Sequence, residues 1–100
     1  MSKETDAKIR DIQDILDAEK EFIERVWYSR HKCLMSKVKD GTLKYEPAIL
    51  ASALAAAKRI EKKYPKKQLR GETDIEWGIM LGKLSALRWV LGDKWDNLSS

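Results

Sequence analysis

The chain of 100 residues contains few of the residue types on which many enzymes depend. Its one cysteine, Cys33, excludes an intramolecular disulfide and a zinc site made of several thiolates. Its one histidine, His31, lies two positions away, so on a helix the two side chains point in different directions and cannot form a nucleophile–base pair. The primary expectation is therefore a protein without catalytic residues, metal ligands or cofactors.

Long apolar stretches are also missing. The most apolar part of the C-terminal region, 77–92, is interrupted by Lys83 and Arg88. A membrane-spanning helix needs about 20 apolar residues, so none is expected here. The first residues are charged from Lys3 onward and lack the apolar centre of a signal peptide. These absences predict a cytoplasmic protein that does not contact a membrane.

Glycine and proline are scarce and mark the ends of predicted helices. No glycine or proline occurs between Ser2 and Asp40, so the pattern predicts a first helix over about 5–40 that stops at Gly41. Pro47 and Pro65 bound a second helix at 47–64. Because no segment alternates like a strand, the predicted fold class is all-α.

The third predicted helix, 74–91, begins with a capping-box pattern formed by Thr73 and Glu76. Gly92 ends it, and Asp93 then begins a short C-terminal turn that folds Trp95 and Leu98 back onto the helices. Residues 1–100 thus form a single helical domain, a small bundle of three main helices plus this turn. We expect the third helix to be central, because it is apolar nearly all round.

The first predicted helix is long for its domain. At 1.5 Å per residue it measures roughly 50 Å, against a diameter of roughly 33 Å for a compact domain of this size. A continuous helix would extend beyond its own domain and favour self-association, with a dimer preferred. The alternative is a break near Tyr28 and Ser29. Candidate interface residues mix aromatic and cationic types: Phe22, Trp27, Tyr28, Arg30 and His31.

Charge is segregated along the chain. Residues 1–24 carry a net charge of −4, whereas 58–70 carry +6. The basic segment predicts either a phosphate-binding surface for DNA or RNA, a dock for acidic residues 1–24 of the same or another chain, or a solvated helix face. Its candidate contact residues are Lys58, Arg59, Lys62, Lys63, Lys66, Lys67 and Arg70.

Two other patterns bear on packing and on metal binding. Gly78, Gly82 and Ala86 are spaced four apart, which predicts a strip where another helix crosses closely. The carboxylate pairs Glu21/Glu24 and Asp93/Asp96 resemble those of all-α nucleotide pyrophosphohydrolases of the MazG type, and the resemblance implies Mg²⁺ held between such pairs on facing helices. A Mg²⁺-dependent nucleotide hydrolase is therefore a minor alternative.

The C-terminal phrase "EWGIMLGKLSALRWVLGDKWDNL", 76–98, and the upstream "VWYSRH", 26–31, carry a family resemblance. The chain resembles a group of small prokaryotic proteins that end in a similar phrase. The resemblance implies a folding unit and a cytoplasmic setting in a prokaryotic cell, and it implies no activity. Together these observations favour a homo-oligomeric, non-catalytic adaptor or accessory subunit, with a sequence-nonspecific nucleic-acid-binding protein as the alternative.

Overall fold

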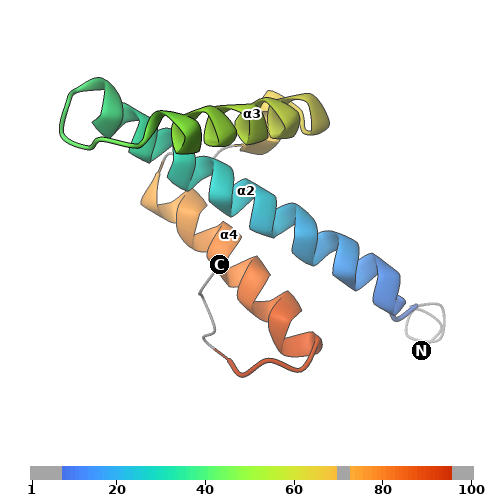
Figure 1. Cartoon of the computed structure of the whole chain (residues 1–100). Coiled ribbons are helices and arrows are strands. Elements are labelled where there is room, and N and C mark those ends of the chain that lie inside the picture. The colour runs from blue at the N-terminus through green and yellow to red at the C-terminus, as the bar shows by residue number, and fades with distance from the viewer. Residues whose placement is uncertain (1–7, 70–72, 96–100) are drawn as a thin grey trace.

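The chain folds as a small all-α bundle, as the sequence predicts (Figure 1). The computed structural model describes residues 8–69 and 73–95. Within them lie helix α2 (Ile12–Lys39), helix α3 (Pro47–Lys63), the short 3₁₀ helix η1 (Lys66–Leu69) and helix α4 (Asp74–Val90). Helix α2 packs against each of the other three elements.

Helix α2 is one continuous helix of 28 residues, so the alternative with a break near Tyr28 and Ser29 is wrong. Its predicted start is also wrong, since residues 8–11 precede the helix and 1–7 lie outside the described residues. Asp11 fixes the start because its carboxylate accepts a hydrogen bond of 2.9 Å from the backbone N–H of Asp14. Gly41, with a φ of 84°, lies just beyond the helix end at Lys39, as predicted.

The other helix boundaries agree with the predictions to within one residue. Pro47 occupies the first turn of α3, where its missing N–H costs no hydrogen bond. Thr73 and Glu76 form the predicted capping box at the start of α4, with the hydroxyl of Thr73 accepting a bond of 3.1 Å from the N–H of Glu76. Trp95 folds back as predicted, whereas Leu98 lies outside the described residues.

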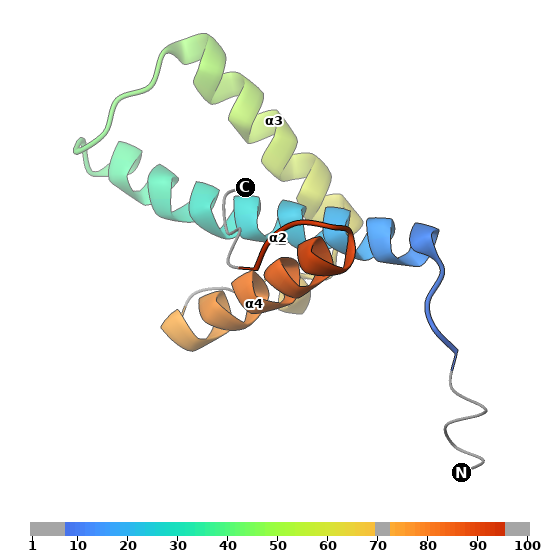
Figure 2. The ribbon, with the colours of Figure 1, turned by 90° about the horizontal axis from the view of Figure 1, so that it is seen from below.

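Helix α2, and not the third predicted helix, is central (Figures 1 and 2). Val26 packs with two residues of α4, Met80 and Leu84, while Tyr28 packs with residues of α3 and η1. Residues two positions apart point in different directions on a helix, so α2 supports two small cores. Helix α4 is apolar nearly all round, yet it uses only one side to contact α2.

The molecule is elongated and leaves much apolar surface in solvent. Its principal extents are 59 × 27 × 23 Å and its radius of gyration is 16.6 Å, against about 13 Å for a compact domain of this length. Figure 2 shows the N-terminal end of α3 standing away from α2, while its C-terminal end approaches it. No helix in the described part of the chain is long and apolar enough to cross a membrane.

Candidate interaction surfaces

One side of α4 is exposed along the whole helix and is apolar, with the exposed Lys83 at its edge. We call it the open face of α4, and it consists of Ile75, Gly78, Ile79, Gly82, Ala86, Trp89 and Val90. Ile75 is 76% exposed and Ile79 is 52% exposed. The opposite side carries Met80, Leu84, Ser85 and Arg88, which are buried. The helix thus has an apolar surface on both sides, and α2 covers one of them.

The small residues predicted to accept a close helix crossing lie within this open face. Gly78, Gly82 and Ala86 are all exposed. A Cβ atom added at Gly78 or Gly82 would meet nothing within 4 Å. The predicted close crossing is therefore absent between the described helices of a single chain, because the strip points away from α2.

The C-terminal tail extends the open face with a second tryptophan. After Gly92 the chain turns back, and the indole ring of Trp95 stacks on that of Trp89. The two side chains remain 56% and 48% exposed, respectively. Aromatic side chains of this size supply large contact areas in protein interfaces.

Two of the predicted interface residues on α2 are buried inside the chain, and this corrects the prediction. Tyr28 and His31 both face α3. The hydroxyl of Tyr28 donates a hydrogen bond of 2.6 Å to the carboxylate of Glu61. Burial and this bond raise the pKa of Tyr28 to about 12. The pattern of mixed aromatic and cationic residues was misleading, because α2 is covered on two sides and these positions belong to its α3-facing side.

The other three candidates lie at the edges of the two cores. Trp27 and Phe22 are half-buried against the cores. The guanidinium of Arg25 lies 4.8 Å from the centre of the Phe22 ring, and the ammonium of Lys83 lies 5.5 Å from it. Arg30 is exposed, and its guanidinium lies 5.9 Å from the ring of Trp77. Of the five candidates, Arg30 alone has an exposed side chain.

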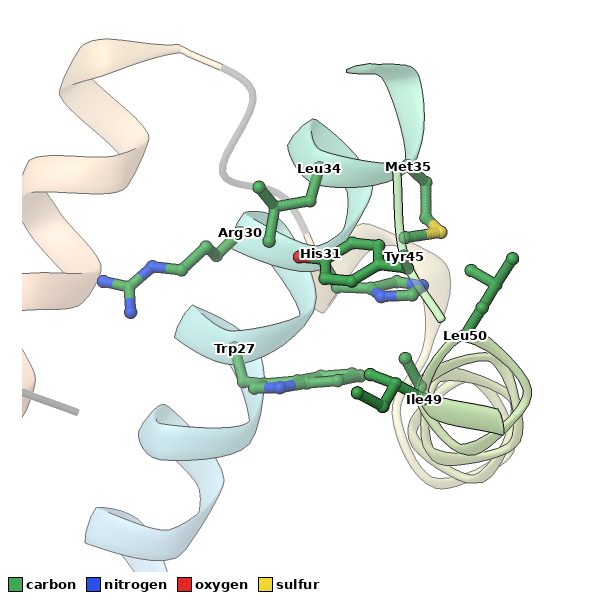
Figure 3. Close-up of a pocket in the computed structure, with 9 residues that line it drawn as sticks. Trp27, Arg30, His31, Leu34, Met35, Tyr45, Ile49 and Leu50 are labelled. Carbon is green, nitrogen blue, oxygen red and sulfur yellow. The ribbon is translucent and has the colours of Figure 1, made fainter. Parts of the chain in front are cut away.

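A mostly apolar pocket opens where α3 diverges from α2 (Figure 3). It contains about 440 Å³ of space outside the protein atoms, part of it open solvent. The rings of Trp27 and His31 stack there at 4.9 Å between centroids. Burial lowers the pKa of His31, although the nearby carboxylate of Glu61 acts in the opposite direction. Ile49 and Leu50 line the pocket from α3, while Arg30 points away from them (Figure 3).

The basic segment forms an exposed surface on α3 and η1. Arg70 lies outside the described residues. We call the remaining six cations the basic surface: Lys58, Arg59, Lys62, Lys63, Lys66 and Lys67. Lys63 pairs with Glu24 of α2 at 2.8 Å, whereas the other five form no ion pair with residues 8–69 or 73–95.

Glu24 joins α2 to the end of α3. One of its oxygens accepts hydrogen bonds from the ammonium of Lys63 at 2.8 Å and from the hydroxyl of Tyr64 at 2.5 Å. Partial burial raises the pKa of the Glu24 carboxyl, but these two bonds and the positive charges of Lys63 and Lys20 together outweigh burial and bring its pKa below the ordinary value of 4.5. Among the described residues, the basic segment therefore contacts the acidic segment 1–24 of the same chain through the carboxylate of Glu24.

The carboxylate pairs do not assemble a metal site in the described part of the chain. Glu24 is committed to Lys63 and Tyr64, and Glu21 pairs with Arg25 at 3.0 Å. Asp96 lies outside the described residues. Among residues 8–69 and 73–95 there is no group of three or more His, Cys, Asp or Glu side chains that could hold a metal ion. Cys33 is exposed.

The isoleucine and valine residues of the open face were not among the sequence candidates. Ile75, Ile79 and Val90 look like core residues in the sequence, because a helix that is apolar all round is normally enclosed. Their spacing relative to the small residues was the available signal, since Ile75, Ile79, Gly82 and Ala86 follow one helical face. No protein-family model matches the chain, and comparisons with curated proteins and with solved structures found no match.

Proposed function

We propose that this protein is a non-catalytic helical interaction module that associates with itself and serves as a homo-oligomeric adaptor or accessory subunit. The observation that supports the proposal is the open face of α4. Seven positions along one side of a 17-residue helix, from Ile75 to Val90, are exposed and uncharged, in a chain of which 36% of residues are charged. Monomeric proteins rarely expose a continuous apolar surface of this kind.

The residue types on the open face are those that stabilise interfaces. Trp89 and its stacking partner Trp95 present large, rigid side chains, and tryptophan is enriched among residues that contribute most to binding. The neighbouring Lys83 directs its ammonium to within 5.5 Å of the Phe22 ring on α2, so burial of the uncharged open face carries no large electrostatic cost. The exposed Ile12 and Leu16 near the start of α2 add a second, smaller apolar area.

A charge placed on the open face tests this function. In the variant Ile79→Lys, an ammonium takes the place of an isoleucine that is 52% exposed, so folding is retained while burial in an interface becomes unfavourable. The matched control is Leu54→Lys on α3, where the leucine is 45% exposed. Light scattering after size-exclusion chromatography should show an oligomer for the wild type and the control, and a single chain for Ile79→Lys. A wild type that remains a single chain would refute the proposed function.

The second candidate function is binding of nucleic acid by the basic surface. It is favoured by the clustering of six exposed cations on α3 and η1, where like charges at Lys58 and Lys62 stand four residues apart. Such pairs destabilise an isolated helix slightly, and phosphate groups would relieve the repulsion. Binding through phosphates does not depend on base sequence and weakens with added salt because counterions are released.

Fluorescence anisotropy with labelled single-stranded and duplex oligonucleotides tests this candidate. The affinity should fall steeply between low and moderate salt, and the double variant Lys58→Glu/Lys62→Glu should abolish binding. Lys44→Glu, in the loop before α3, is the control that changes net charge outside the basic surface. Equal affinity for the double variant and the control would eliminate this function.

A further inference from the structure

The open face of α4 has a nearly symmetric distribution of side-chain sizes about Gly82. Gly78 lies four residues before Gly82 and Ala86 lies four residues after it. Ile75 and Trp89 lie seven residues away on either side. Small residues therefore occupy the middle of the open face and large apolar ones occupy its two ends.

We propose that two copies of this chain pair antiparallel through their α4 helices, which cross at Gly82. The proposal rests on the proposed self-association and specifies its partner and geometry. A two-fold axis perpendicular to α4 at Gly82 brings Gly78 of one copy opposite Ala86 of the other. The same axis brings Ile75 of one copy near Trp89 of the other. Small residues then meet small ones at the crossing, and large residues fill the space where the helices diverge.

The small residues permit a close approach of the two helix backbones. Positions four apart on a helix form a ridge, and such ridges pack at an angle of about 50° when they align with those of a second helix. A Cβ atom at Gly78 or Gly82 would meet nothing within 4 Å in the single chain. The space in front of the glycines is thus open to a second backbone.

The helix dipole and the acidic first turn of α4 favour the antiparallel arrangement. The first turn carries Asp74 and Glu76, whereas Arg88 in the last turn is buried on the α2-facing side, 4.0 Å from the carboxylate of Glu19. In an antiparallel pair the acidic first turns of the two copies lie far apart, and the helix dipoles oppose each other favourably. A parallel pair would instead place two acidic turns together.

The open face and Trp95 together supply most of the area that a stable dimer buries. The exposed fractions of Ile75, Ile79, Val90 and the two stacked tryptophans range from 48% to 76%. Their complete burial would remove on the order of 600 Å² per chain, against about 800 Å² per partner in a stable interface. The exposed Gly78, Gly82 and Ala86 add further area to this surface.

Disulfide trapping tests the antiparallel pairing directly. Cys33 is first replaced by Ser, because it is exposed and would form cross-links of its own. Two single-cysteine variants, Gly78→Cys and Ala86→Cys, are then oxidised in a glutathione buffer, separately and as a mixture. A disulfide needs Cα atoms within about 7 Å, whereas positions 78 of two antiparallel copies lie about 12 Å apart along the helix direction. Intact mass distinguishes the mixed dimer from either homodimer.

We expect the mixture to form the mixed disulfide as its main cross-linked product, and each variant alone to remain largely uncross-linked. Efficient cross-linking of each variant with itself would overturn the antiparallel arrangement in favour of a parallel one. Absence of any cross-link, while sedimentation still shows a dimer, would overturn the α4 pairing and leave self-association in place. A single-chain mass in sedimentation would overturn both the α4 pairing and the self-association.

Discussion

The indole ring of Trp95 lies flat on that of Trp89, with 4.7 Å between the ring centroids and 13° between their planes. The stack joins the C-terminal tail to the last turn of α4. Both side chains nevertheless remain about half exposed. A rigid, half-exposed aromatic pair at the end of an apolar face is a surface suited to burial against a second protein chain.

Removal of the Trp95 ring should weaken self-association more than it weakens folding. For Trp95→Ala, the free energy of unfolding is measured below the dissociation constant, where the protein is a single chain. We expect it to fall by less than about 1.5 kcal/mol, which is the scale of one aromatic pair. The dissociation constant of the dimer should rise by about tenfold or more. Trp95→Phe, which keeps a ring on Trp89, should recover most of the affinity. Dilution followed by size-exclusion chromatography measures the affinity, and an unchanged dissociation constant in Trp95→Ala would contradict the role of the stack.

The carboxylate of Glu24 should stabilise the fold only while it is charged. Glu24→Gln removes the charge that Lys63 and Tyr64 contact, and we expect the free energy of unfolding at pH 7 to fall by about 1 kcal/mol, since the pair is partly exposed. Because the pKa of Glu24 is below 4.5 in the folded chain, its contribution is present above pH 4.5. It disappears as the pH falls through the folded-state pKa.

Urea denaturation of wild type and variant at pH 7 and at acidic pH measures this difference. Glu21→Gln is the control, because Glu21 pairs with Arg25 on the same helix and joins no second helix. Its substitution should change the free energy of unfolding by only a few tenths of a kcal/mol. A difference between Glu24→Gln and wild type that persists undiminished in acid would contradict the assigned cause.

Protonation of His31 should destabilise the folded chain. Burial lowers the pKa of His31 below its ordinary value of 6.5, so the neutral ring is the form that folding favours. The contribution is present above pH 6.5 and is lost as the pH falls through the folded-state pKa. His31→Phe keeps a flat ring against Trp27 and should reduce the slope of unfolding free energy against pH between 7 and 5. An unchanged slope would show that another group controls this pH range.

The sequence was sufficient to predict the helices because their ends have strong local chemistry. Pro47 at the start of α3 and the Thr73–Glu76 capping box at the start of α4 both act within a few residues. The start of α2 was predicted too early. Asp11 caps the helix, which therefore begins at Ile12, although no glycine or proline marks this position. Local signals therefore gave the secondary structure and most of its boundaries.

The arrangement of the helices depended on information that the pattern of one helix does not contain. Helix α4 is apolar on both sides, so its sequence does not indicate which side meets α2 and which stays open. The burial of Tyr28 was missed for a related reason, since α2 is covered on two sides and few of its positions remain for a partner. The small residues of α4 were recognised from their spacing, but the spacing alone does not tell whether the helix that crosses them belongs to the same chain.

Sedimentation equilibrium of the wild type and of Gly82→Leu tests the central claim, self-association through the open face. A Cβ atom at position 82 meets nothing within 4 Å in the single chain. A glycine inside a helix also lowers stability by about 1 kcal/mol relative to alanine. As a single chain, the variant should therefore melt no lower than the wild type. We predict a wild-type dimer of twice 11.6 kDa at micromolar concentrations and a single chain for Gly82→Leu. A wild type with a single-chain mass up to near-millimolar concentration, or a variant as dimeric as wild type, would contradict the account.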